Sequence, residues 1–210
     1  MTDAGVQPQR TNRRGYATRE NMLEAALKAL ATGDPGAVSA NRIAKQIGAT
    51  WGVVQYQFGD ADGLWAAVLH RTAEHRADVF EQTNTSAPLR QRVADIIDTL
   101  YDGLTATDSK AIENLRAALP RDPAELERLY PRTAAELQSW GRGWLATCQN
   151  AFAGLVVDPA RVREVATFIP GAMRGITSER QIGSYFDLDM ARRGLTNAIV
   201  AYLEASDSGG

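Results

Sequence analysis

The sequence has few of the residues and motifs that catalysis or membrane insertion would need. Its 210 residues include one cysteine, Cys148, which cannot form a disulfide within the chain, and two histidines, His70 and His75, whose i, i+5 spacing does not align both imidazoles for zinc. There is no phosphate-binding glycine loop, no serine elbow and no apolar run near the roughly 18 residues that cross a bilayer. We therefore expect no catalytic residue, no metal, no cofactor and no enzymatic activity.

The N-terminal sequence also has no apolar segment of the kind found in secretory signals. It reads MTDAGVQPQRTNRRG, which is polar and basic throughout. A single cysteine is compatible with a reducing compartment. The expected location is therefore the cytoplasm.

Basic side chains are concentrated near the N-terminus, although the net charge of the chain is −2. The first 57 residues carry seven basic and four acidic side chains, whereas the remainder carries 16 and 21. A basic head on an acidic body would allow only the head to meet a polyanion such as DNA. An uneven but merely solvated surface explains the charge distribution equally well.

Apolar residues recur with helical periodicity along nearly the whole chain, and no convincing period-two alternation is present. Several helix boundaries have clear chemistry: Ser39, Asp122 and Asp158 are suited to N-caps, and Gly48 can take the left-handed conformation that ends a helix. We expect Pro131 to interrupt or kink the chain of helices. The fold class predicted is all-α, with about nine helices.

The stretch IAKQIGATWGVVQYQF, residues 43–58, has the pattern of two short helices joined by a tight turn. Ala44 is small where the helices would cross, and Gly48 admits the positive φ of the turn. Burial of Val54 and Phe58 would then leave an outward face that carries Trp51, Gly52, Gln55 and Tyr56. Such a face fits a DNA major groove, in which glutamine can bond to adenine; packing of Trp51 and Tyr56 against another helix is the alternative.

Residues from about Arg13 to Arg71 resemble the N-terminal DNA-binding domain of the TetR family of bacterial transcriptional repressors. The resemblance includes the segments NMLEAALKAL and SANRIAKQIG, the Gly48-Ala49-Thr50 turn, and Tyr56-Gln57-Phe58 followed by Gly63-Leu64. It implies a basic flexible arm over residues 1–14, a helix-turn-helix domain over 15–62, and a helical ligand-binding and dimerisation domain over 63–210. The body resembles the family only in the number and order of its helices.

Two positions depart from the family pattern. Gln55 stands where a tyrosine is usual, so we expect it to read adenine directly. Ala61 stands where a phosphate-binding lysine is usual, and it is flanked by the acids Asp60 and Asp62. We expect these acids to cap the next helix while placing negative charge near the DNA backbone. The arginines near the N-terminus are candidates to replace the missing cation; alternatively they form a leader with no role.

The sequence and the resemblance together predict the residues that meet double-stranded DNA. They lie in the arm, in the first helix of the motif and in the recognition helix. These residues are Arg13, Arg14, Ser39, Asn41, Arg42, Thr50, Trp51, Gly52, Gln55, Tyr56 and Gln57.

The resemblance also implies a homodimer formed through the last two helices and a small-molecule effector that enters the body. Aromatic and apolar side chains could line the effector site, although at helical spacing they are at least as often core residues. The candidates are Tyr101, Trp140, Trp144, Phe168 and Met173.

The function that follows is that of a ligand-responsive repressor, which binds a palindromic operator as a dimer and is released by a largely apolar molecule. One alternative is a DNA-binding protein of the same fold that organises chromosomes or answers to a protein partner. Another is a helical module whose head only imitates a helix-turn-helix.

Overall fold

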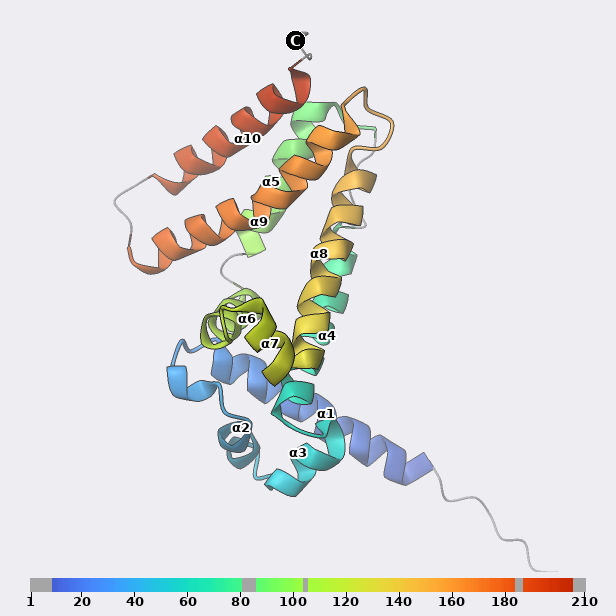
Figure 1. The fold of residues 1–210 in the computed structure, drawn as a ribbon, viewed down its shortest axis with the longest axis vertical. Coiled ribbons are helices and arrows are strands. Elements are labelled where there is room, and N and C mark those ends of the chain that lie inside the picture. Colours follow the sequence, from blue (N-terminus) through green and yellow to red (C-terminus); the bar gives the residue numbers. More distant parts are fainter. Residues whose placement is uncertain (1–8, 81–85, 104–105, 184–186, 206–210) are drawn as a thin grey trace, which may run out of the picture. The chain divides into compact units, whose positions relative to one another are not determined.

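The computed structural model describes residues 9–80, 86–103, 106–183 and 187–205, and over these ranges the secondary structure is entirely helical (Figure 1). There are ten α-helices and a short 3-10 helix, η1, in the described ranges. Their bounds are α1 (Gln9–Leu30), η1 (Pro35–Ala37), α2 (Ala40–Gln46), α3 (Trp51–Phe58), α4 (Ala61–Phe80), α5 (Leu89–Gly103), α6 (Thr107–Ala118), α7 (Pro123–Leu129), α8 (Pro131–Ala151), α9 (Pro159–Gln181) and α10 (Leu188–Glu204).

The all-α prediction is confirmed, but the count of about nine helices was one too low. The additional helix is α6, which was not predicted from the sequence. Ala111, Ile112 and Leu115 on this helix are buried, and their i, i+1, i+4 spacing is that of one helical face. The helical spacing of apolar residues was therefore present in the sequence, but it involved only three residues.

The predicted caps are confirmed. The Ser39 side chain accepts from the Arg42 backbone N–H at 3.4 Å, and Asp122 accepts from the Glu125 N–H at 2.8 Å. Asp158 caps α9 in the same way through the N–H of Ala160. These predictions succeeded because a cap depends on residues within one turn of each other.

The chain folds into two compact units, each with its own core. The first comprises the residues up to Thr72 together with Thr107–Leu137, and the second comprises Ala73–Ala106 together with the residues from Gln138 onward. α6, α7 and the first turns of α8 therefore belong to the same unit as the helix-turn-helix. The functional boundary expected near residue 62 remains a prediction, but the compact unit extends beyond it.

In the first unit, α1 packs against α2 and α6. Met22, Ala26 and Leu30 form the buried stripe of α1. The Asn114 side chain of α6 donates to the carbonyl of Leu30 at 2.7 Å, and the Gly33 backbone N–H donates to the same carbonyl at 3.3 Å, so the last carbonyl of α1 has two donors. The helix-turn-helix is thus built on α1, and α6 supports α1.

In the second unit, α10 packs against α5 and α9 around an aliphatic core (Figure 1). Arg92 of α5 is 3% exposed, and its guanidinium donates to the carbonyls of Ala87, Ala151 and Ala153 at 2.8–2.9 Å. These bonds tie the end of α8 to the start of α5, so Arg92 has a structural role.

Candidate nucleic-acid interface

The turn between α2 and α3 has the geometry that the sequence predicts. Gly48 has φ +69°, and the N–H of the next residue, Ala49, donates to the carbonyl of Ala44 at 2.8 Å. A residue with a Cβ would be strained at this φ. Ala44, Val54 and Phe58 are buried, so the two helices are held by the residues expected to hold them.

The opposite side of α3 faces outward. Gly52 and Gln55 are exposed, Tyr56 is 85% exposed, and Trp51 is 37% exposed. The outward orientation predicted for these four residues is confirmed. A short helix that presents two aromatic rings, an amide and a glycine on its free face offers stacking, hydrogen-bonding and close-approach groups together.

Glycine at position 52 is not required by the fold. A Cβ there would meet nothing nearer than the hydroxyl of Thr50 at 3.6 Å, which is an ordinary contact. Glycine inside a helix nevertheless costs about 0.5–1 kcal/mol relative to alanine. The close approach of DNA to this backbone, expected from the sequence, remains a prediction.

Gly52→Ala is therefore expected to raise the free energy of unfolding by about 0.5–1 kcal/mol while weakening DNA binding about tenfold, or about 1.4 kcal/mol. Urea denaturation and fluorescence anisotropy with labelled DNA would measure the two effects. Gly141→Ala, at a helical glycine of α8 with nothing within 4 Å of an added Cβ, is the matched control and should change stability only. Unchanged DNA affinity in Gly52→Ala would show that this backbone does not approach DNA.

Gln57 differs from the outward position expected for it. It is half-buried, and its side-chain amide donates to the carbonyl of Gly15 at 3.1 Å. Arg19 donates to the carbonyl of Gln57 at 3.0 Å and lies over the Phe58 ring at 4.6 Å. In this structure Gln57 ties α3 to α1, and the sequence offered no local signal of a partner more than 40 residues away.

The remaining DNA candidates lie around the motif. Thr50 and Asn41 are exposed, and Thr50 is the N-cap residue of α3 but makes no side-chain cap bond. Arg42 is exposed and pairs with Asp34 at 2.6 Å, so a phosphate would have to compete with that carboxylate. The backbone of Arg13 and Arg14 is helical, because α1 begins at Gln9; their side chains lie outside the described part of the chain.

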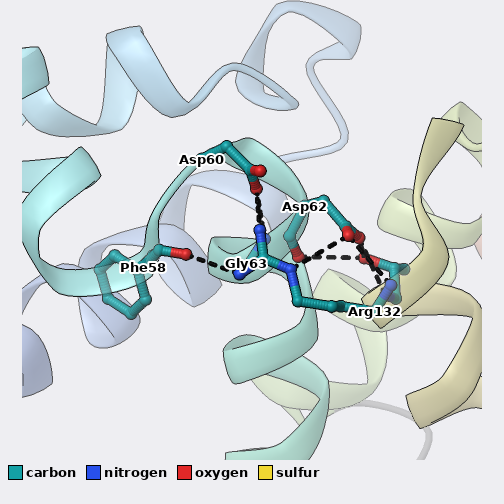
Figure 2. Close-up of polar contacts among 6 residues, drawn as sticks. Phe58, Asp60, Asp62, Gly63 and Arg132 are labelled. Carbon is teal, nitrogen blue, oxygen red and sulfur yellow. Dashed lines mark hydrogen bonds and ion pairs between the residues drawn. The ribbon is translucent and has the colours of Figure 1, made fainter.

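Asp60 and Asp62, the two acids beside Ala61, are engaged by the start of α8 (Figure 2). Arg132 Nη2 contacts Asp60, and Arg132 Nε lies 3.3 Å from Asp62 Oδ2. Burial by itself raises the pKa of Asp62, but the Thr133 hydroxyl, the Arg132 and Thr133 amides and the Arg132 guanidinium lower it to a net value below the ordinary 3.8. Both acids were expected to cap α4 and to repel phosphate; Asp60 does accept from the Gly63 N–H at 2.9 Å, whereas the contact with Arg132 was not predicted.

The five effector candidates are not gathered around one cavity in the described structure. Tyr101 and Trp144 pack against the core of the second unit, to which the buried Met173 belongs, while Trp140 is half-buried and Phe168 is 42% exposed. A hollow of about 370 Å³ lies elsewhere in this unit. It is lined by Val156, Val157, Asp158, Arg161, Leu203, Glu204 and Ala205, and by none of the candidates.

Trp144 has a structural partner that explains its position. Its indole N–H donates to the carbonyl of Ala166 at 2.7 Å. That carbonyl lies four residues before Pro170, which has no N–H to complete the helical bond. Trp144 therefore supplies the hydrogen bond that the proline removes.

Other reactive or ligating groups do not form a second site in the described ranges. There, no cluster of three or more His, Cys, Asp or Glu side chains could hold a metal ion. Burial raises the pKa of the Cys148 thiol to about 12, so the thiol stays protonated and unreactive near neutral pH. No helix in the same ranges is long and apolar enough to cross a membrane.

The architecture thus defines an all-α protein with a helix-turn-helix in its first compact unit. No protein-family model matches the sequence, and no curated protein matches it either. Among solved structures, the chain is similar to a protein from Rhodococcus sp. assigned to the TetR-family transcriptional regulators, with 18% identity, a TM-score of 0.63, and coverage of 89% of this chain and 98% of that one.

A second similar structure is the multidrug binding protein EbrR complexed with imidazole. The sequence identity is again 18% and the TM-score is 0.65. The match covers 97% of this chain and 100% of that chain. The chain therefore has the fold of TetR-family regulators over nearly its whole length.

Proposed function

We propose that the chain is a DNA-binding transcriptional regulator, and that it acts as a homodimeric, ligand-responsive repressor on an inverted-repeat operator. The observation that carries the proposal is the free face of α3, where Trp51, Gly52, Gln55 and Tyr56 point outward from the second helix of a helix-turn-helix. The TetR fold supports it, because two proteins of this fold match the chain over 89% and 97% of its length and one of them is described as a TetR-family transcriptional regulator.

The outer faces of α9 and α10 support the dimer. Phe168, Met190 and Tyr202 are 42%, 62% and 41% exposed, and a Cβ added at Gly175 or Gly194 would meet nothing within 4 Å. Large apolar side chains beside small residues allow two helix pairs to pack closely across a two-fold axis. A second copy of the chain would bury these groups.

The effector proposal has separate support. One protein of this fold is described as a multidrug binding protein and was crystallised with imidazole. In this chain, three candidates have exposed surface, because Tyr101 and Trp140 are half-buried and Phe168 is 42% exposed. Met173 is buried, and the Trp144 indole is bonded to Ala166. The effector proposed is a small molecule with a largely apolar body.

Selection of binding sites from random DNA by the full chain tests the proposal. We expect recovery of an inverted repeat whose half-sites lie about one helical turn, roughly 34–36 Å, apart. Two chains should bind per recovered site. Failure to enrich any sequence would reject the DNA-binding proposal, and many unrelated dispersed sites in a genomic footprint would favour a chromosome-organising role instead.

Gln55→Ala is expected to weaken binding to the selected site by roughly 1–3 kcal/mol, because an amide that bonds adenine N6 and N7 would be lost. Affinity for non-specific DNA should not change, since that affinity depends on phosphate contacts. Gln149→Ala, at an exposed glutamine of α8, deletes the same group outside the head. Equal losses on specific and non-specific DNA would reject base reading by Gln55.

A further inference from the structure

The start of α8 and the α3–α4 junction cap each other's helix ends. We propose that Arg132 is a positioning residue for the recognition helix α3, so that the first turn of α8 is part of the DNA-reading device. This inference rests on the proposed function, because it assigns a role within DNA recognition.

The first half of the arrangement acts on the C-terminal end of α3. Phe58 is the last residue of α3, and its carbonyl is one of the groups that a helix leaves without an internal partner. Arg132 Nη1 donates to this carbonyl at 2.9 Å (Figure 2). A cation at this end also interacts favourably with the helix dipole.

The second half acts on the N-terminal end of α8. Pro131 occupies the first position of α8 and has no N–H, so the next two amides are the ones that need acceptors. Both find them on the Asp62 carboxylate: the Arg132 N–H lies 2.9 Å from Oδ2, and the Thr133 N–H lies 2.9 Å from Oδ1. Asp62 belongs to α4, so the capping residue comes from a helix that begins 70 residues earlier.

The cap on the start of α8 is held in a largely dehydrated setting, whereas the Arg132 side chain that caps α3 is 47% exposed. Asp62 is 6% exposed and Thr133 is fully buried, and the Thr133 hydroxyl adds a bond of 2.7 Å to the carboxylate. Hydrogen bonds to charged groups are worth more when water is excluded. The direction of α3 is therefore fixed at its end by α8 as well as along its side by α2.

Helix α8 belongs to both compact units, although its contact with the α3–α4 junction lies in the first unit. α8 is continuous from Pro131 to Ala151, and its residues from Gln138 onward belong to the second unit. Within the first unit, Arg132 therefore joins the first turn of α8 to the end of the reading helix.

A direct contact between Arg132 and DNA phosphate is the competing role, because its side chain is 47% exposed. The two roles differ in salt dependence. Loss of a phosphate contact would reduce the slope of log K against log salt by about 0.9, whereas loss of positioning leaves the number of phosphate contacts unchanged.

The test compares Arg132→Ala with Arg128→Ala in the full chain. Arg128 is an exposed arginine of α7 in the same unit and is paired with Glu125 at 3.9 Å. Because both residues are arginines, each substitution removes one positive charge. We expect Arg132→Ala to accelerate amide hydrogen exchange at residues 54–64 by about tenfold or more relative to the control. Binding to the selected site should weaken about tenfold, with an unchanged salt slope.

Arg132→Lys separates geometry from charge. A lysine keeps the cation but cannot donate to Phe58 and both aspartates at once, so it should restore less than half of the lost protection, as measured on a logarithmic scale. This variant also serves if Arg132→Ala does not fold. Full protection in Arg132→Lys, unchanged exchange in Arg132→Ala, or a salt slope lower by about 0.9 would each overturn the positioning role.

Failure of the proposed DNA-binding function and failure of the positioning role of Arg132 give different experimental results. If the wild-type chain enriches no DNA, the DNA-reading role falls, and hydrogen exchange alone then decides whether Arg132 fixes α3. Faster exchange confined to residues 54–64 would keep the positioning contact, and unchanged exchange would reject it.

Discussion

Gly63→Ala is expected to lower the free energy of unfolding by about 3–5 kcal/mol, the largest effect we predict. A Cβ at this position would lie 2.0 Å from the carbonyl oxygen of Phe58 and 2.5 Å from Arg132 Nη1. The first of these atoms is backbone, so α3 and α4 would have to separate. Separation would also break the bonds by which Arg132 holds the end of α3 (Figure 2).

Urea denaturation would measure this loss, with Gly52→Ala as the matched control. Both glycines lie in helices of the first unit, but only Gly63 has no room for a methyl group. The two substitutions should therefore change the unfolding free energy in opposite directions. A cost below about 1 kcal/mol for Gly63→Ala would mean that the α3–α4 junction yields easily, and that it cannot fix the direction of α3.

The features predicted correctly from the sequence are those whose cause lies within a few residues. The N-caps at Ser39, Asp122 and Asp158, the positive φ of Gly48 and the outward face of α3 all depend on spacing within one or two helical turns. Gly63 entered the prediction only as part of the resemblance to the TetR family. Its physical reason, the close approach of the Phe58 carbonyl, required the structure.

The features missed from the sequence depend on partners far along the chain. Asp60 and Asp62 looked like a source of repulsion toward DNA, because their partner Arg132 follows 70 residues later. Gln57 looked like a groove-facing side chain for the same reason, since its acceptor Gly15 precedes it by 42 residues. Local patterns place a residue on a helix face, but they do not say which distant group that face meets.

A hydrogen bond in the structure connects Trp144 of α8 with the helix turn that Pro170 interrupts in α9. Trp144 was predicted to line an effector site, and Pro170 is a proline inside α9. The proline leaves the carbonyl of Ala166 without its helical donor, and the Trp144 indole donates to it at 2.7 Å. The two residues are therefore expected to be energetically coupled.

Trp144→Phe is accordingly expected to lower the free energy of unfolding by about 2–4 kcal/mol, because it leaves the Ala166 carbonyl unsatisfied and opens a cavity. In a Pro170→Ala background, the backbone N–H at position 170 can donate to the same carbonyl. Trp144→Phe should then cost about 1–2 kcal/mol less, which a double-mutant cycle measured by urea denaturation would detect.

Trp140→Phe provides the control for this cycle. Trp140 lies on the same helix one turn earlier and is also half-buried, whereas the indole bond to the Ala166 carbonyl comes from Trp144. Its substitution should therefore add to Pro170→Ala without coupling. Coupling of less than about 0.5 kcal/mol between Trp144 and Pro170 would mean that the indole bond adds little to stability. Trp144 would then be free to serve in an effector site, because a ligand could displace its hydrogen bond at small cost.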